Sequence, residues 1–162
     1  MTHRRLNIAV YLIIFVALVD QMSKWWIINR VMKDEIGPLK INSVLNIVLV
    51  ENRGITFGLL NQVNHTWTPY FLLALAAVIL FLLGRWLWRT HSTPVAIGLG
   101  LIMGGAIGNV IDRIRYGAVV DFLDFYIRLG PKEHHWPAFN VADSAIVAGV
   151  GLLLLDGLLK GR

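Results

Sequence analysis

Four apolar segments, each close to the length of a bilayer crossing, constrain the fold of this chain more than any other feature. A transmembrane helix needs about 20 mostly apolar residues. Backbone inside the hydrocarbon core must satisfy its hydrogen bonds internally, which favours helices. We therefore predict a membrane α-helical protein, a four-transmembrane-helix bundle in one domain of residues 1–162. The predicted helices run over about residues 6–28, 70–88, 95–111 and 141–159.

The composition agrees with a membrane protein. Hydrophobic residues make up 56% of the chain and charged residues only 15%, whereas a soluble domain carries about 25% charged residues. With a mean hydropathy of +0.63, the surplus apolar surface must face lipid. The net charge of +5 is spread over loops and helix ends, as expected beside headgroups, so no nucleic acid partner is expected. The chain has no cysteine, which excludes disulfides, zinc–thiolate sites and a cysteine nucleophile.

The first apolar segment is expected to stay in the protein as a helix. Arg4 and Arg5 followed by Leu6–Val19 resemble a secretory signal peptide, but Asp20–Lys24 follows where a small-residue cleavage site would stand. A raw count of Lys and Arg opposes a cytoplasmic N-terminus. We nevertheless expect one, because the first helix usually dominates the orientation and the loop 85–89 is short.

A β region is predicted at about residues 38–60, between the first two helices. Ile41–Val50 is rich in β-branched residues and is typical of a strand. Glu51–Gly54 is typical of a turn, and Ile55–Leu59 is predicted to return as a second strand. Such a small sheet at the membrane surface can bind an extended peptide as an added strand.

Glycines at four-residue spacing mark the third apolar segment. Gly100, Gly104 and Gly108 form a stripe that lets another helix approach closely. Asn109 and Arg113 continue the segment and lie on one helix face. The stripe fits any membrane bundle and indicates no particular function.

Carboxylates stand at the ends of the apolar segments. Asp112, Asp121 and Asp124 follow the third segment, and Asp143 opens the fourth. Acids at the edge of hydrocarbon are energetically expensive and therefore indicate a functional site. Two carboxylates that meet can share one proton and activate water. We therefore predict a paired-aspartate site.

Two of these residues also have purely structural interpretations. Asn140 lies three residues before Asp143, so Asn140 can cap the fourth helix while Asp143 lies in its first turn, where the helix dipole favours a carboxylate. This interpretation is compatible with a catalytic one. Asp121 could instead be a solvated turn residue.

Structural alternatives exist for two more polar residues. Asp20 and Lys24 are four apart in the first helix, where an ion pair between them satisfies both. Asn52 stands beside Gly54 and is typical of a turn, with a substrate contact as the alternative.

Other common catalytic arrangements are not expected. Glu133, His134 and His135 invite a metal interpretation, but adjacent residues do not share a face and no second ligand cluster follows. We expect neither a metal nor another cofactor. The sequence contains no Ser-His-Asp set, GxSxG elbow or glycine-rich phosphate loop.

Taken together, these residues resemble the lipoprotein signal peptidase family, the signal peptidase II family of bacterial membrane aspartyl proteases. The resemblance covers nearly the whole chain in order, and ordered blocks are more specific than any single motif. The matching blocks are Asp20–Lys24; Asn52–Gly54 with Phe57; Gly104–Asn109 through Asp112 and Arg113; Gly117 with Val119–Phe122; and Phe139–Asp143.

The resemblance assigns roles to individual residues. It implies that Asp121 and Asp143 are the catalytic dyad, while Asp124 lies outside the matched positions. The remaining matched polar residues fall into two groups. Substrate binding or support of the dyad is implied for Asn52, Asn109, Arg113 and Asn140, and structural support for Asp20, Asp112 and Lys24.

The resemblance also implies an activity. The expected function is an intramembrane aspartyl endopeptidase that removes the signal peptide from diacylglyceryl-modified prolipoproteins, cutting before the lipidated cysteine. The expected location is the bacterial cytoplasmic (inner) membrane. Both termini would be cytoplasmic, and a small β-cradle and the active site would face outward. The expected partners are the prolipoprotein substrate and membrane lipid, and we expect a monomer.

The chain departs from the family pattern in two places. Ile55-Thr56 and Gly58 replace the small residues and serine that usually follow the Asn-x-Gly turn. Residues 128–136 form a longer and more polar connection than the family pattern predicts. Neither departure touches the dyad, so we expect effects on substrate preference rather than on activity.

Three other functions can be built on the same residues. Asp20, Asp112, Asp121 and Asp143 could form the proton relay of a small proton-coupled transporter or channel subunit, although transporter acids tend to lie at mid-membrane. The acids could also hold magnesium in a lipid-headgroup transferase. A structural membrane subunit with snorkelling polar helix ends is the third alternative.

Overall fold

The computed structural model describes residues 3–33, 37–54 and 68–160. It contains four helices that are long and apolar enough to cross a membrane, which confirms the four predicted spans. They are α1 (His3–Trp26, continued by a π-helical turn at Ile27–Val31), α2 (Thr68–Arg89), α3 (Thr93–Tyr116) and α4 (Val141–Lys160).

Most of the helices extend beyond the predicted apolar runs, because their end turns carry polar residues that the apolar pattern does not include. In α3, Ser92 caps the start, Pro94 occupies the first turn, and Arg113 and Arg115 lie in the last turn, where basic side chains complement the helix dipole. Gly117 ends α3 with a φ of +69°, and its N–H donates to the Arg113 carbonyl.

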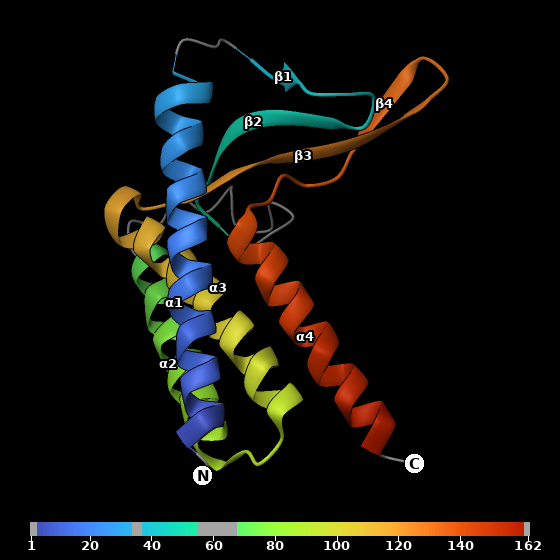
Figure 1. Ribbon diagram of the computed structural model, residues 1–162. Helices are drawn as coiled ribbons and strands as arrows, with labels where there is room; N and C mark the ends of the chain where they lie inside the picture. The colour runs from blue at the N-terminus through green and yellow to red at the C-terminus, as the bar shows by residue number, and fades with distance from the viewer. Residues whose placement is uncertain (1–2, 34–36, 55–67, 161–162) are drawn as a thin grey trace.

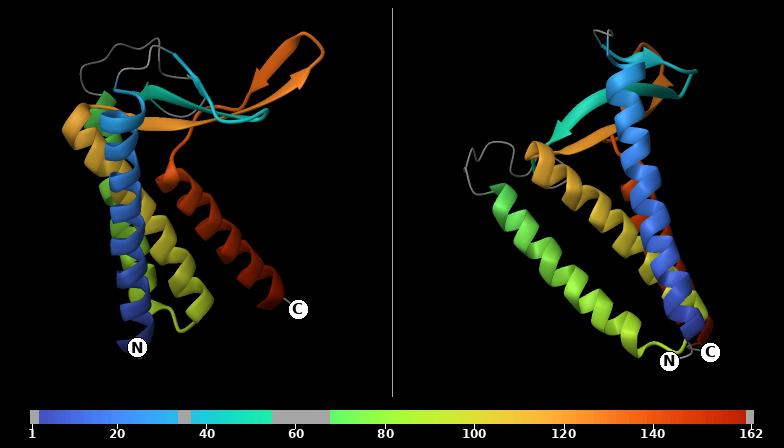
Figure 2. Two further views of the ribbon diagram at one scale, coloured as in Figure 1. Left: turned by 45° about the horizontal axis from the view of Figure 1, so that its top comes forward. Right: turned by 60° about the vertical axis from the view of Figure 1, so that its left-hand side comes forward.

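Helix α3 is the centre of the bundle. It packs closely against α1 and α4 and less extensively against α2 (Figures 1 and 2). A Cβ at Gly104 would lie 2.8 Å from the Val16 Cβ of α1, so only glycine permits this approach. Gly98 of α3 and Gly149 of α4 form the equivalent close contact on the other side of α3. The predicted glycine stripe therefore packs against α1, and further glycines of α3 allow the close approach of α4.

A four-stranded antiparallel sheet lies across one end of the bundle (Figure 1). The strands are β1 (Leu39–Lys40), β2 (Leu45–Asn52), β3 (Val119–Leu129) and β4 (Lys132–His135), in the order β1-β2-β3-β4. Where the sheet meets α1, Ile27 and Met32 pack against Ile47 and Phe122 in a small core. Both ends of the described chain lie at the opposite end of the bundle (Figure 1).

The predicted β region is confirmed by β1 and β2, although β2 starts later than predicted and runs through Asn52. The predicted second strand, Ile55–Leu59, lies outside the described residues, as do the departures at Ile55-Thr56 and Gly58. The described partners of β2 are β1 and β3, and in the pairing with β3 Val50 lies opposite Asp121.

The interpretation of Asp121 as a solvated turn residue is wrong. Asp121 lies inside β3 and is only 2% exposed. Apart from its two acids and Leu123, the run Val119–Tyr126 consists of β-branched and aromatic residues, which fit a pleated surface. The predicted connection between the dyad residues is therefore mostly a long β-hairpin.

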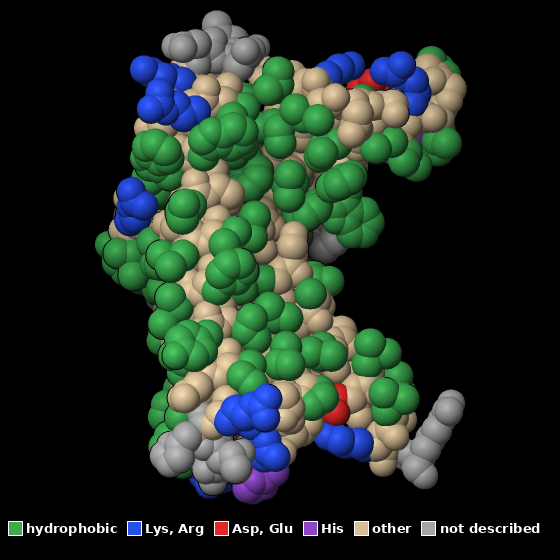
Figure 3. All heavy atoms as spheres, in the orientation of Figure 1, with side chains coloured by type: hydrophobic (Ala, Val, Ile, Leu, Met, Phe, Trp, Pro, Cys, Tyr) green, Lys and Arg blue, Asp and Glu red, His purple; other side chains and the backbone are tan. Residues whose placement is uncertain are grey.

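The surface is divided between apolar and charged side chains. Hydrophobic side chains cover the helical part of the visible face, while Lys and Arg gather toward its two ends (Figure 3). On α4, apolar side chains such as Leu154 and Leu158 are exposed. The helical part of this face is thus apolar, as expected of helices that span a membrane.

Candidate active site

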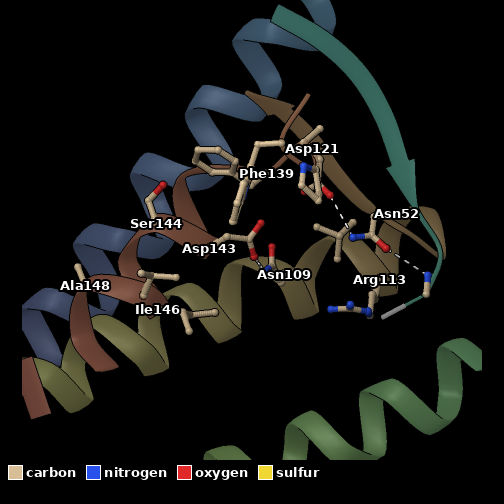
Figure 4. A pocket seen from close by; sticks show the side chains of 15 residues that line it. Asn52, Asn109, Arg113, Asp121, Phe139, Asp143, Ser144, Ile146 and Ala148 are labelled. Atoms are coloured by element: carbon tan, nitrogen blue, oxygen red, sulfur yellow. Dashed lines mark hydrogen bonds between the residues drawn. The ribbon is translucent and has the colours of Figure 1, made fainter. Parts of the chain in front are cut away.

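The two predicted catalytic aspartates line the same cavity, of about 830 Å³ (Figure 4). Asp121 is presented by β3, and Asp143 by the first turn of α4. The sheet and the bundle therefore each supply one carboxylate, and the cavity forms where they meet.

Asn140 connects the two carboxylates. Its side-chain amide donates to Asp121 Oδ1 at 2.7 Å, and its backbone N–H donates to Asp143 Oδ2 at 3.2 Å. Its Oδ1 accepts from the Asp143 N–H at 2.9 Å, which is the predicted helix cap. Asn140 is fully buried, so the cap of α4 and the link between the carboxylates are one rigid feature.

Two further asparagines each support one carboxylate. Asn109 donates to Asp143 Oδ1 at 2.9 Å, and its own Oδ1 accepts from Asn140 at 3.2 Å. Asn52 donates to Asp121 Oδ2 at 3.1 Å and accepts from the Gly54 N–H at 3.2 Å. Asn52 therefore makes the predicted turn contact with Gly54 and also contacts Asp121 in the cavity.

The environments of the two carboxylates differ. Burial raises the pKa of Asp121 from 3.8 to about 6; hydrogen bonds from Asn52 and Asn140 oppose this rise, and the nearby charge of Asp143 adds to it. Asp143 lies at a helix N-terminus, which stabilises negative charge. Asp121 is therefore suited to carry a proton.

Behind the carboxylates lies a buried ion cluster, defined here as Asp20, Lys24 and Asp112. The Lys24 ammonium lies 2.8 Å from Asp20 Oδ2 and 2.7 Å from Asp112 Oδ2, and all three side chains are at most 3% exposed. The predicted Asp20–Lys24 pair is present. The contact with Asp112 was not predicted, because it joins helices far apart in the sequence.

The ion cluster holds the backbone next to each of the two predicted catalytic aspartates. Asp112 Oδ2 accepts from the Val120 N–H at 3.1 Å, and Asp20 Oδ1 accepts from the Ala142 N–H at 3.0 Å. Lys24 also donates to Asn109 at 3.2 Å. The cluster therefore fixes both the strand and the helix that present the carboxylates.

The cavity has one polar end and one apolar wall. Arg113 reaches the polar end (Figure 4), where it interacts electrostatically with both carboxylates. In the described part of the chain it forms no ion pair with them. The apolar wall was not predicted from the sequence. This wall consists of Trp136, Pro137, Ala138, Phe139, Ile146, Val147 and Ala148.

Asp124 does not belong to the cavity lining. It lies three residues after Asp121 in β3 and therefore points to the other face of the strand. There it is 6% exposed and accepts from Asn46 at 2.8 Å, with His135 Nδ1 at 2.9 Å. Within the described residues, no group of three or more His, Asp or Glu side chains is arranged to hold a metal ion.

Comparisons with known proteins agree on one family. The family described as "Signal peptidase (SPase) II" matches residues 12–159. A lipoprotein signal peptidase of Nitrobacter hamburgensis is 43% identical over 143 residues, covering 88% of this chain and 87% of that protein. One from Shewanella pealeana is 37% identical over 154 residues, covering 94% and 86%.

Two solved structures, each described as a bacterial membrane enzyme, share the fold. The first is 31% identical with a TM-score of 0.75 and covers 94% of this chain and 87% of that one. The second is 28% identical with a TM-score of 0.76 and covers 95% and 94%. The similarity therefore extends over the helices and the sheet together.

Proposed function

The chain belongs to the signal peptidase II family, and from that premise we propose an aspartic, metal-independent endopeptidase with Asp121 and Asp143 as its catalytic dyad. The protein removes signal peptides from prolipoproteins. Its proposed substrate carries a diacylglyceryl group, and the cut falls before the lipidated cysteine. The observation that carries the proposal is Asn140, which hydrogen-bonds both carboxylates in a cavity with one apolar wall.

The proposed reaction uses one proton held between the two carboxylates, since two like charges at close range do not both ionise readily. Ionised Asp143 takes a proton from water, whose oxygen attacks the scissile carbonyl carbon. Protonated Asp121 donates its proton to the carbonyl oxygen. When the intermediate collapses, Asp143 gives its proton to the leaving nitrogen and Asp121 recovers one from the hydroxyl group.

Polar and apolar parts of the cavity serve different parts of the substrate in this proposal. Asn52 and Arg113 can hold the peptide backbone near the carboxylates, because both line the cavity beside Asp121. Donors already in place at a water-poor site stabilise developing charge better than water does. The apolar wall around Phe139 and Val147 suits acyl chains or apolar side chains.

The proposed location is the bacterial cytoplasmic membrane, with both termini cytoplasmic and the cavity at the outer face. The end of the bundle that holds the termini also holds Arg4, Arg5, Arg85, Arg89 and Lys160. Basic residues in short loops favour the cytoplasmic side. We propose that the protein acts as a monomer surrounded by lipid.

The test is cleavage of a diacylglyceryl-modified prolipoprotein by the purified protein in detergent, with and without EDTA. Asp121→Asn and Asp143→Asn should each lose cleavage, while the wild type should keep it in EDTA. The matched control is Asp124→Asn, an acid of the same strand on its other face, which should keep the dyad intact. Normal cleavage by either dyad variant would refute the assignment, and loss in EDTA would favour the magnesium-dependent alternative.

Neither the fold nor the relatives support the alternative of a proton-coupled transporter or channel subunit. Asp20, Asp112, Asp121 and Asp143 gather at the end of the bundle that carries the sheet, whereas transporter acids tend to lie near the bilayer midplane.

A further inference from the structure

The β3–β4 hairpin has one face that is apolar along β3, with His134 and Lys132 of β4 opposite Ile127 and Leu129. Side chains alternate along a strand, so Phe125, Ile127 and Leu129 share a face of β3. Trp136 joins them, because its N–H donates to the Phe125 carbonyl and the two residues lie opposite each other. These four side chains are 41%, 55%, 60% and 66% exposed, respectively.

The other face of the hairpin is polar. Arg128 pairs with Glu133 across the strands, and His135 stacks on Tyr126 with ring centroids 5.4 Å apart. Lys40 of β1 lies 3.8 Å from Glu133 on the same side. The hairpin is therefore amphipathic across its two faces.

The hairpin lies beside the helices and above the lipid-facing surface. It extends sideways from the sheet past the start of α4 (Figures 1 and 2). Hydrophobic side chains follow the side of this projection that faces the level of the helices, and Lys and Arg side chains lie on its other side (Figure 3). The apolar face thus looks toward the level of the exposed apolar residues of α4, across the hollow beside the start of that helix.

We propose that the β3–β4 hairpin is a membrane anchor that lies in the phospholipid interface of the leaflet on the cavity side. Phe125, Ile127, Leu129 and Trp136 insert among the acyl chains, since a contiguous apolar face of this kind marks an interaction surface. Tryptophan favours the headgroup level. Lys132 at the hairpin tip, exposed in the structure, reaches lipid phosphates by snorkelling.

Charge and position argue for lipid rather than a protein partner. The four helices already fix a bilayer beside this face, and in the outer part of the hairpin, residues 125–136, Arg128 and Lys132 outnumber Glu133. Cationic side chains at the rim of an apolar face complement phosphate groups. The occupant of the face is therefore the bilayer itself.

The anchor is mechanically connected to the cavity. Phe125 stacks on Phe139 with ring centroids 5.8 Å apart, and both Trp136 and Phe139 line the cavity. Insertion of the hairpin therefore sets the depth at which the cavity meets lipid. The inference deepens the proposed partnership with membrane lipid and does not require the proposed peptidase activity.

Because the native chain has no cysteine, single cysteines can report depth without further substitutions. The variants Ile127→Cys and Leu129→Cys are each labelled with a nitroxide and placed in phospholipid nanodiscs. The collision rate of the nitroxide with oxygen, which concentrates in lipid, is compared with its collision rate with a nickel chelate, which stays in water. Arg128→Cys, between them on the opposite face, is the matched control. Leu154→Cys in α4, 63% exposed, is the lipid-exposed standard.

The expected oxygen-to-nickel ratio at residues 127 and 129 is severalfold higher than at residue 128 and approaches that at Leu154. Equal nickel accessibility at residues 127, 128 and 129 would overturn the inference. Activity is not needed for this readout. If the hairpin lies in lipid but the protein cleaves no prolipoprotein, the membrane anchor is supported and the proposed function is refuted.

Discussion

Asn140 performs two tasks that usually belong to separate residues. Its Oδ1 caps α4, and its amide nitrogen donates to Asp121. Serine also caps helices well but offers no amide to reach across the cavity. Substitution at this one position can therefore separate helix stability from chemistry.

We expect Asn140→Ser to reduce kcat by about 100-fold, the usual effect of losing one preorganised donor. Asn140→Ala should lose activity equally and should also lose the cap, a further destabilisation of about 1 kcal/mol. The measurements are prolipoprotein cleavage and thermal unfolding of both variants in the same detergent. A serine variant with wild-type kcat would show that Asn140 acts only as a cap.

Asp121 should make stability depend on pH. Its pKa is raised from 3.8 to about 6 on folding, so the folded protein binds a proton at Asp121 that the unfolded protein releases between these values. The contribution of Asp121 to stability is thus fully present below about pH 4 and is lost as the pH rises through about 6.

The melting temperature of the wild type should therefore fall relative to that of Asp121→Asn between pH 4 and pH 7, and the difference should level off above that range. Thermal unfolding of both proteins across this range measures it, and the comparison cancels pH effects common to both. Parallel curves for the two proteins would contradict the raised pKa.

At the scale of the elements, α3 and α4 approach each other without side chains between them. A Cβ at Gly105 would overlap the Ala142 carbonyl oxygen and lie 2.8 Å from the Ile146 side chain. The first turn of α4 would have to shift, and Asn140 and Asp143 belong to that end of the helix.

Gly105→Ala should therefore destabilise the protein by about 1–3 kcal/mol, the usual range for overpacking, and should lower cleavage activity. The matched control is Gly151→Ala in α4, where an added Cβ meets nothing within 4 Å and should leave both properties unchanged. Thermal unfolding and cleavage assays on the two variants test this. Equal behaviour of the two variants would mean that the α3–α4 contact tolerates a wider separation.

The elements differ in how far the sequence predicts them. The helices follow from apolar runs of membrane length, and β2 follows from its β-branched residues. The β3–β4 hairpin was missed because Val119–Phe122 is buried on both faces, so no alternation of apolar and polar residues marks the start of the strand. Asp121 and Asp124 were interpreted as functional acids, and acids are uncommon in strands.

The site divides in the same way. Asp121, Asp143 and their three asparagines were identified as site residues from the motif blocks that resemble the family, and these blocks can be located in the sequence alone. The second ion pair of Lys24, to Asp112, depends on the packing of α1 against α3. No local pattern encodes that packing, so no sequence argument could have paired them.

At the scale of the whole molecule, Lys24 holds the parts together. Through Asp20 it connects α1 to the start of α4, and through Asp112 it connects α3 to the start of β3. Removal of this single ammonium leaves two buried carboxylates without their counter-ion, which typically destabilises a protein by about 3–5 kcal/mol.

We therefore expect Lys24→Met to lower the melting temperature strongly. The matched control is Lys160→Met, which breaks an i,i+4 pair with Asp156 whose lysine is 60% exposed and should change stability by less than about 1 kcal/mol. Thermal unfolding of both variants in detergent measures the difference. Similar small losses in both would show that the buried cluster does not hold the fold together.

Asp121 and Asp143, the proposed catalytic pair, lie at one end of the bundle, beside the sheet. They can therefore exchange protons with only one of the two aqueous compartments that the membrane separates. With their pKa values fixed by the site, their protonation follows the pH of that compartment, and the pH of the other compartment has no direct effect on it. Because the pair does not lie at the midplane, a proton that reaches it crosses little of the electrical potential of the membrane. That potential therefore has little effect on the pKa values of the pair.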